Sequence, residues 1–411
     1  MIGVDSLTRE DIKHPINLMG KGFMVDRFGH YRWLREEAPV YRGKLAVMNV
    51  YFVSRYEDCV SVSKDPRFVR NRSTATGGRR FPIPIPRPIE HLMKSMIAED
   101  GDNHRRLRGL VQQAFSPKSM AKLEPRIEGL THALLDDIEK KGSVDLMTEY
   151  AFPIPVTVTG EMVGVSSEDM PGIRNTMKVL SDGLSGWNVL RTLFWDLRKT
   201  SEFIRGLVVK KRENPGDDIL TGLIEAEEDG ERLTEDELVS MVFLLVIAGY
   251  ETTVHLITNG MLALFEHPEQ LALLRERPEL MDSAVEEILR YAGPIHATKP
   301  NYTTEDVEIH GVTIPKGSMV MPLLASANRD ELVFENPDEF KIERTPNRHL
   351  AFGFGPHTCP GAPLARMETR IALKNLLDRN PNLRLGVERD ELRVQRLPGW
   401  YRYESLPVVL G

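Results

Sequence analysis

Hydrophobic residues recur along most of this chain with the 3.6-residue period of an amphipathic helix. Residues 28–39 and 116–232 follow this period, the latter with short breaks at glycine and proline. In residues 102–115, one predicted helical face collects Leu107, Leu110, Val111 and Phe115. The pattern predicts a mainly helical protein.

β-Branched and aromatic residues gather in three shorter stretches, about residues 40–54, 295–325 and 383–410. The sequence Pro315-Lys316-Gly317 predicts a hairpin turn inside the second stretch. No linker-like, repetitive or low-complexity tract divides the chain. We therefore expect a mainly α fold with a smaller β-rich part, organised as a single domain over residues 1–411.

A long helix is predicted near the middle of the chain. Thr234 and Glu237 have the spacing of a capping box, and Pro268 marks the expected end. Residues 241–248 are apolar on all sides, which indicates a buried centre. The following residues 249–253, Gly-Tyr-Glu-Thr-Thr, are unfavourable in a buried helix. They indicate either a kink with back-bonded threonines or a functional site.

Composition narrows the class of protein. The net charge of −7 and the pI of about 6.0 argue against nucleic acid as the main partner. Two cysteines cannot build a disulfide framework, which fits a reducing cytoplasm. The N-terminus lacks the apolar core of a signal peptide or anchor, and the longest apolar run, Met241–Gly249, is short for a bilayer. We expect a soluble cytoplasmic protein without a membrane anchor.

The most specific segment is residues 349–370, HLAFGFGPHTCPGAPLARMETR. A turn-rich loop presents Cys359 just ahead of a predicted helix N-terminus, which lowers the pKa of a thiol and suits a nucleophile or a metal ligand. A lone cysteine is more often a small buried residue, which is how we interpret Cys59.

This segment resembles the haem-binding loop of the cytochrome P-450 family. The matching positions are Phe352, Gly353, Gly355, His357, Cys359, Gly361, Leu364, Ala365 and Arg366. The resemblance implies the cytochrome P-450 fold, with haem b bound between the long central helix and the cysteine loop. It also implies that Cys359 is the axial thiolate ligand of the iron and that Phe352, Gly353, His357 and Gly361 belong to the cofactor site.

The central helix resembles the same family at Ala248-Gly249-Tyr250-Glu251-Thr252-Thr253. By resemblance, Glu251 and Thr252 are the acid–alcohol pair that delivers protons to bound dioxygen. Gly249 would leave room for dioxygen, and Ala248 would line the cofactor site. His255 is interpreted as an ordinary helix residue.

Three further positions are assigned to the haem propionates. His104 and Arg108 lie four residues apart and share a predicted helix face, which by default is a solvated basic surface. The family often places His-x-x-x-Arg here to reach the propionates. Many relatives also have an arginine where this chain has Asn301, and Lys299 is the candidate substitute.

Glu287 and Arg290 match the Glu-x-x-Arg of the family, which braces the cysteine loop. A pair at this spacing is usually a weak surface ion pair. We expect Arg344 or His349 to complete the network. The proline-rich segment 74–90 is either a surface linker or docking peptide, or the counterpart of a variable substrate-contacting loop in the family; we predict the pocket-lining role.

The resemblance implies a bacterial monooxygenase that uses dioxygen to hydroxylate or epoxidise a lipophilic small molecule. Polyketides or macrolides, terpenoids and steroids are the substrate classes, as in secondary metabolism. Electrons would come from NAD(P)H through a ferredoxin or flavodoxin and its reductase. The alternatives are a hydrogen-peroxide-dependent peroxygenase, against which the Glu251–Thr252 pair argues, and a non-catalytic haem protein that activates a partner enzyme.

Overall fold

The computed structural model describes residues 12–80, 92, 94–112, 115–166, 168–183, 195–228, 233–395 and 397–411. Of the proline-rich segment 74–90 predicted to line a pocket, residues 81–90 lie outside these ranges. The chain forms two compact units: the first comprises Met1–Pro82, Glu286–Cys359 and Val394–Arg402, and the second Ile83–Val285, Pro360–Arg393 and Tyr403–Gly411. The single-domain organisation expected from the sequence stays a prediction.

The first unit contains most of the strands. Its elements are α1 (Lys21–Val25), α2 (Arg27–Glu37), β1 (Val40–Leu45), β2 (Met48–Val53), α3 (Tyr56–Lys64), β3 (Phe68–Val69), α4 (Arg72–Thr76), β5 (Asn301–Thr303), β6 (Val307–Ile309), β7 (Val312–Ile314), β8 (Met319–Pro322) and α16 (Leu324–Ala327). Helix α15 (Met281–Ala292) leads into this unit from the second.

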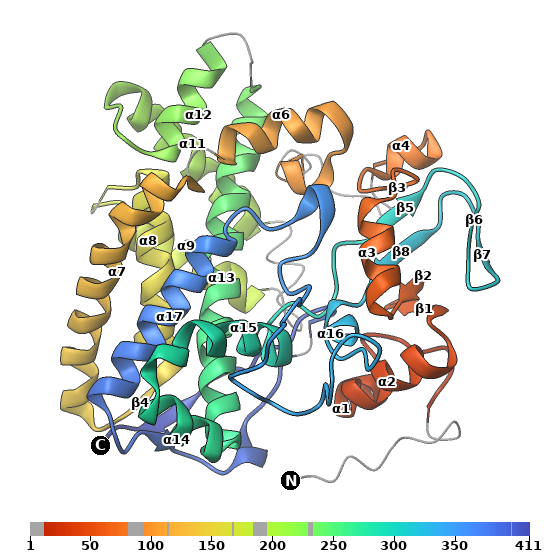
Figure 1. Cartoon of the computed structure of the whole chain (residues 1–411). Coiled ribbons are helices and arrows are strands. Elements are labelled where there is room, and N and C mark those ends of the chain that lie inside the picture. The colour runs from red at the N-terminus through yellow and green to blue at the C-terminus, as the bar shows by residue number, and fades with distance from the viewer. Residues whose placement is uncertain are drawn as a thin grey trace. The chain divides into compact units, whose positions relative to one another are not determined.

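Five strands form one sheet in the order β1-β2-β8-β5-β3 (Figure 1). The side chains of the central strand β8 alternate between two hydrophobic clusters, as the two-residue period of a strand requires. Met319 and Met321 join one cluster, and Val320 joins the other. The sheet is therefore buried on both faces.

The hairpin predicted at residues 315–317 is wrong. The hairpin joins β6 to β7, and its turn is His310-Gly311, with φ angles of 50° and 72°. Positive φ at two successive positions is the geometry that a tight two-residue turn needs. Residues 315–317 instead connect β7 to β8, a strand of a different sheet.

The second unit is mainly helical. Its elements are α6 (Gly101–Gln112), α7 (Pro117–Ile138), β4 (Ser143–Asp145), a π-helical turn (Met147–Ala151), α8 (Pro153–Val163), α9 (Met170–Gly183), α11 (Leu197–Glu213), α12 (Ile219–Glu228), α13 (Glu235–Glu266), α14 (Pro268–Glu276), α17 (Ala362–Arg379), β9 (Arg384–Leu385) and β10 (Pro407–Val409). The three strands form a small antiparallel sheet in the order β4-β10-β9.

The predicted central helix is confirmed as α13, with Thr234 as its N-cap. Thr234 Oγ1 accepts a hydrogen bond from Glu237 N at 3.2 Å, and Glu237 Oε2 accepts one from Thr234 N at 2.8 Å. This reciprocal capping box satisfies two of the amide groups that a helix N-terminus leaves without an intrahelical partner.

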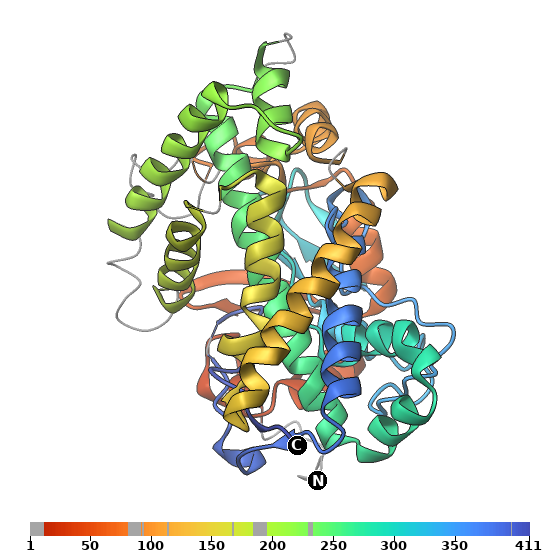
Figure 2. The ribbon, with the colours of Figure 1, turned by 90° about the vertical axis from the view of Figure 1, so that its left-hand side faces the viewer.

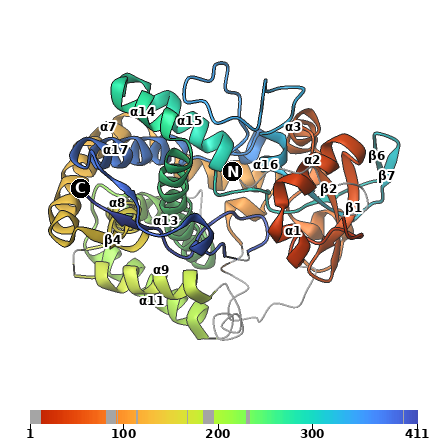
Figure 3. The same ribbon diagram turned by 90° about the horizontal axis from the view of Figure 1, so that it is seen from below.

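Helices α8 and α17 pack against α13, and α7 packs on α8 and α17 from outside (Figures 2 and 3). Helix α13 is long and apolar enough to cross a membrane by length and composition alone. Within its most apolar stretch, however, 67% of the residues are buried inside the structure, as expected of a core helix.

Candidate functional site

The cysteine loop is shaped by two glycines with left-handed backbone conformations. Gly353 has a φ angle of 72° and donates its N–H to Leu350 O at 2.8 Å. Gly355 has a φ angle of 73°, and a Cβ at this position would lie 2.5 Å from Ser63 O. Any larger residue at position 355 would face both backbone strain and a clash.

The loop closes on itself at the cysteine. Cys359 N donates to Phe352 O at 2.9 Å, and Thr358 Oγ1 donates to Gly355 O at 2.8 Å. A single helical turn, Gly355–His357, lies within the loop that the bond from Cys359 N to Phe352 O closes. Cys359 is exposed, and helix α17 begins three residues later with Gly361 as its N-cap. An accessible thiol in a rigid loop ahead of a helix N-terminus suits a metal-bound thiolate.

Cys59 has the opposite environment. It is fully buried in α3, its thiol donates to Val53 O at 3.3 Å, and burial raises the pKa of the thiol. A thiol held in its protonated form is not suited to ligate a metal. Only Cys359 among the two cysteines has the accessibility of a ligand.

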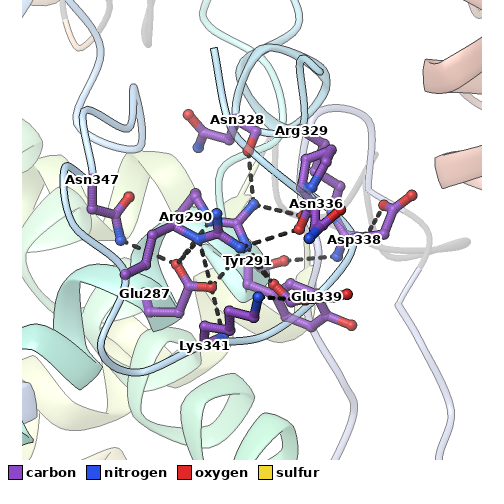
Figure 4. Close-up of polar contacts among 12 residues, drawn as sticks. Glu287, Arg290, Tyr291, Asn328, Arg329, Asn336, Asp338, Glu339, Lys341 and Asn347 are labelled. Atoms are coloured by element: carbon purple, nitrogen blue, oxygen red, sulfur yellow. Dashed lines mark hydrogen bonds and ion pairs between the residues drawn. The ribbon is translucent and has the colours of Figure 1, made fainter. Parts of the chain in front are cut away.

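A buried ion pair lies where α15 meets the loops of the first unit (Figure 4). Arg290 Nε and Nη2 donate to the two carboxylate oxygens of Glu287, both at 2.8 Å. The same guanidinium also donates to three backbone carbonyls, those of Pro337 (2.7 Å), Glu339 (2.9 Å) and Asn328 (3.0 Å). Both ion-pair side chains have no accessible surface. Burial lowers the pKa of Arg290, and the Glu287 carboxylate opposes this shift.

Arg344 completes the network around Glu287. Its Nε lies 3.2 Å from both carboxylate oxygens, and only 8% of its side chain is exposed. Lys341 N and Asn347 Nδ2 donate to the same carboxylate at 2.9 and 3.1 Å. The other residue expected here, His349, does not reach Glu287.

His349 pairs instead with the neighbouring carboxylate, Glu286, at 3.0 Å. Nδ1 of the same ring accepts a hydrogen bond from Ala351 N at 3.2 Å. Leu350 N donates to Asn328 Oδ1 at 2.6 Å. Since Asn328 O also binds Arg290, one residue links the buried ion pair to the start of the cysteine loop.

The residues expected to handle dioxygen lie on α13 in the second unit. Thr252 Oγ1 donates to Ala248 O at 2.7 Å, which is the back-bonded arrangement of a helical threonine. Ala248 is exposed and Thr252 half-buried, although most of the surrounding helix is buried. Glu251 has only 2% of its surface exposed.

Gly249 has a packing role that the sequence did not indicate. A Cβ at this position would lie 2.6 Å from Oγ1 and 3.0 Å from Cγ2 of Thr159 on α8. The absence of a side chain thus lets α8 approach α13 closely. The predicted role of Gly249 in making room for dioxygen stays a prediction.

Two further titratable residues of the second unit are buried: Glu368, which the sequence did not single out, and His255, which was interpreted as an ordinary helix residue. Glu368 on α17 is fully buried, and burial raises the pKa of its carboxyl to about 8. His255 on α13 is 4% exposed, and burial lowers its pKa to about 4. Both groups are therefore mainly uncharged near neutral pH. Spacing could have revealed Glu368, because it shares a helical face with Leu364, Ile371 and Ala372.

The two candidates for propionate binding on α6 differ in exposure. His104 is 4% exposed, and Arg108, one turn later, is half-buried. Arg106, between them, forms an ion pair with Glu237 at 2.6 Å and so ties α6 to the first turn of α13. Arg105 pairs with Asp102 at the surface.

Lys299 and Asn301 lie in the first unit at the start of β5. Lys299 is exposed, and partial desolvation by the surrounding protein lowers its pKa below the ordinary lysine value. The positive charges of Arg70 and Arg80 act in the same direction. Asn301, where many relatives were expected to have arginine, is 4% exposed, and its Nδ2 has no hydrogen-bond partner among the described residues.

The predicted site residues thus fall into two groups. The first unit holds Phe352, Gly353, His357, Cys359, Glu287, Arg290 and Lys299; the second holds His104, Arg108, Ala248, Gly249, Glu251, Thr252 and Gly361. The described residues contain no cluster of three or more His, Cys, Asp or Glu side chains that could hold a metal ion. A metal centre with Cys359 as its single protein ligand is compatible with this finding.

The sequence model of the family described as Cytochrome P450 matches residues 12–380. The chain belongs to the cytochrome P450 family. The polyketide biosynthesis cytochrome P450 PksS of Bacillus subtilis is 38% identical over 397 residues, which cover 95% of this chain and 98% of the relative. The vitamin D(3) 25-hydroxylase of Pseudonocardia autotrophica is 40% identical over 384 residues, 93% of each chain.

Solved structures of cytochromes P450 confirm the mainly helical fold. The structure of PksS matches with a TM-score of 0.88 at 37% identity, covering 96% of this chain and 100% of that one. P450BioI, solved in complex with an acyl carrier protein ligated to hexadec-9Z-enoic acid, matches with a TM-score of 0.86 at 35% identity, covering 95% and 100%. By its family, the protein is a cytochrome P450 monooxygenase.

Proposed function

We propose that this cytochrome P450 inserts one atom of dioxygen into a C–H or C=C bond of a lipophilic small molecule. The proposal is carried by the presence of two motifs in one chain, each with a local geometry that suits its role. One is the glycine-shaped loop that exposes Cys359, and the other is the acid–alcohol pair Glu251–Thr252 on the long helix α13. Each is defined within its own unit.

The family implies a haem-thiolate cofactor, which we take to be haem b with Cys359 as its axial ligand. When bound, such a group activates dioxygen, and its thiolate favours cleavage of the O–O bond. The loop suits this role because the thiol is accessible while its backbone is fixed by the bond from Cys359 N to Phe352 O. The residues Phe352, Gly353, His357 and Gly361 shape the same loop.

Positive side chains are proposed to hold the two propionates. A carboxylate removed from water needs a charged or hydrogen-bonding partner. His104 and Arg108 on α6, together with Lys299 at the start of β5, are the proposed partners. Ala248 and Gly249 are proposed to border the cofactor on α13.

Glu251 and Thr252 are proposed to move protons. In the present geometry the Thr252 hydroxyl hydrogen is committed to Ala248 O. To donate a proton to dioxygen, this hydroxyl must leave the Ala248 carbonyl, and a nearby carboxyl must supply the proton that the hydroxyl passes on. Glu251, which is buried and directly precedes Thr252 on α13, is the proposed source of that proton. The protons leave with the second oxygen atom as water.

Glu287 and Arg290 are proposed to act structurally. Their ion pair fixes the backbone carbonyls of Asn328, Pro337 and Glu339, and Asn328 in turn binds Leu350 N ahead of the cysteine loop. Loss of the pair is therefore expected to reduce haem incorporation and not only turnover.

The substrate class is proposed from the relatives. The proposed classes are polyketides or macrolides, terpenoids and steroids, and the relatives named for polyketide biosynthesis and for vitamin D(3) hydroxylation support polyketides and steroid-like molecules. Electrons would come from NAD(P)H through a ferredoxin or flavodoxin and its reductase, in the bacterial cytoplasm. An acyl carrier protein, as bound by P450BioI, is a further kind of partner to consider for a tethered substrate.

An isotope experiment tests the proposal. Compounds from these classes are first screened for the absorbance shift that marks displacement of water from the iron. A compound that gives the shift is then incubated under ¹⁸O₂ with NADPH, ferredoxin and ferredoxin reductase. One ¹⁸O atom in the product is expected. Product formed only with added hydrogen peroxide, and unlabelled under ¹⁸O₂, would refute the proposal and support a peroxygenase.

A further inference from the structure

Strand β3 is a two-residue edge strand with an arginine on each side, Arg67 before it and Arg70 after it. It pairs antiparallel with β5, with Phe68 opposite Thr303 and Val69 opposite Tyr302. One residue further in the same register, Arg70 comes opposite Asn301. The chain thus carries an arginine directly across the ladder from Asn301, the position at which many relatives are expected to have one.

Positive charges converge at this end of the sheet. The guanidinium of Arg70 donates through Nη1 to the backbone oxygen of Lys299. Partial desolvation and the positive charges of Arg70 and Arg80 lower the pKa of the exposed Lys299 ammonium below its ordinary value. Lys299 forms no ion pair with a carboxylate among the described residues. Like charges held together in this way favour an anion at the same place.

The sequence around β3 also has an excess of positively charged residues. Residues 66–89 contain no aspartate or glutamate in a chain whose net charge is −7. Their charged residues are Arg67, Arg70, Arg72, Arg79, Arg80 and Arg87. Of the described members, Arg67 is neutralised by Asp65 at 2.6 Å, with Glu305 at 3.7 Å. The Arg67 end of β3 is therefore balanced by acidic side chains, whereas arginine is the only type of charged residue in the sequence from Arg70 to residue 89.

Asn301 supplies an independent indication of a ligand. Its side chain is buried, and its Nδ2 is a donor without a hydrogen-bond partner in the described part of the chain. A buried amide N–H without a partner is costly, so such a donor is usually satisfied by a ligand or an ordered water. Its position in β5, two residues after Lys299, puts it at the same strand end.

We infer that Arg70, Lys299 and Asn301 form a carboxylate-binding subsite, with Arg80 adding positive charge. A guanidinium fork, an ammonium and an amide N–H together match the two oxygens of a carboxylate. The inference rests on the proposed function, because that function offers two sources of a carboxylate. One is a haem propionate, for which Arg70 replaces the arginine absent at position 301, and the other is the acid end of a lipophilic substrate.

The two arginines that flank β3 provide a matched pair of variants. Arg70→Gln and Arg67→Gln remove the same charge from opposite ends of the same strand. Haem and haem dimethyl ester are compared by the rate at which each is lost to excess apomyoglobin. Myristic acid and 1-tetradecanol are compared by their dissociation constants from the absorbance shift. A lost charge-assisted hydrogen bond changes binding by about tenfold or more.

We expect Arg70→Gln to weaken the binding of a carboxylate ligand by about tenfold or more, and the binding of its neutral analogue by less than about twofold. Arg67→Gln should change neither. An effect confined to haem over its dimethyl ester assigns the carboxylate to a propionate, and an effect confined to myristic acid over the alcohol assigns it to the substrate. If Arg70→Gln equals Arg67→Gln in both comparisons, the subsite is overturned.

Asn301→Asp gives a second variant in case Arg70→Gln does not fold. It keeps the side-chain size but opposes a carboxylate ligand with a negative charge, so it should discriminate against the acids in the same way. Asn301→Arg in the Arg70→Gln background should restore the binding of the carboxylate ligand. The thiolate-type spectrum of the reduced carbon monoxide complex is recorded for every variant. If it is present while the comparisons show no difference, the subsite fails and the proposed function stands.

Discussion

Replacement of Glu287 by glutamine tests the buried ion pair with the smallest change in shape. The carboxylate accepts two bonds of 2.8 Å from Arg290 and lies 3.2 Å from Arg344 Nε. The side chain of Arg290 is fully buried, and that of Arg344 is 8% exposed. In Glu287→Gln the two guanidinium groups lose their shared counter-charge, and the new amide presents N–H donors to groups that can only donate.

The magnitude follows from this geometry. Breaking a buried ion pair by removing one partner costs about 3–5 kcal/mol, because the remaining charge stays buried without compensation. The three backbone carbonyls still bind Arg290, so a cost within this range and not above it is expected. Since whole domains are stable by about 5–15 kcal/mol, this one substitution removes a large share of the stability.

Glu286→Gln is the matched control. The residue precedes Glu287 on α15, carries the same charge, and pairs with His349 at 3.0 Å while 31% of its side chain is exposed. A partly exposed pair of this kind contributes less than about 1 kcal/mol. The two variants and the wild type are unfolded in guanidinium chloride and followed by near-ultraviolet circular dichroism, and the haem content of each purified protein is measured.

Glu287→Gln should lower the free energy of unfolding by about 3–5 kcal/mol and reduce haem content, whereas Glu286→Gln should do neither. If the two variants differ by less than about 1 kcal/mol, the buried pair does not hold these loops.

Two further predictions concern the second unit. Burial raises the pKa of Glu368 from 4.5 to about 8, so the folded state holds a proton that the unfolded state has released; the free energy of unfolding should fall between these pH values, by up to about 1.4 kcal/mol per pH unit. Glu368→Gln should flatten this dependence in urea titrations from pH 5 to 8, and an unchanged slope would count against it. Gly249→Ala places a Cβ 2.6 Å from Thr159 Oγ1 and should cost about 1–3 kcal/mol. The cost should be smaller in a Thr159→Ala background, which thermal unfolding of the wild type, the two single variants and the double variant would show. If the effects of the two substitutions on the free energy of unfolding simply add, this contact is not the cause.

Features that depend on local sequence could be predicted. The start of α13 follows from the spacing of Thr234 and Glu237, because a capping box is formed by neighbours in the chain. The hairpin turn could not be placed, because His310 is an unusual residue at positive φ and the Pro-Lys-Gly sequence gave a stronger turn signal.

Features that depend on contacts between distant segments were only partly accessible. The spacing of Glu287 and Arg290 suggested the pair, but its burial rests on carbonyls of the irregular segment 328–339, which has no periodicity to interpret. The choice of Arg344 over His349 likewise depends on how that segment folds. The approach of Thr159 to Gly249 depends on the packing of two helices, which no local pattern encodes.

The central claim is that Cys359 ligates the haem iron, and one spectrum tests it most directly. The ferrous carbon monoxide complex is recorded for the wild type, for Cys359→Ala and for Cys59→Ala, the last of which removes the buried cysteine of α3. The account predicts the red-shifted absorption of a thiolate-bound haem in the wild type and in Cys59→Ala, and its loss in Cys359→Ala. Retention of that absorption in Cys359→Ala would contradict the account.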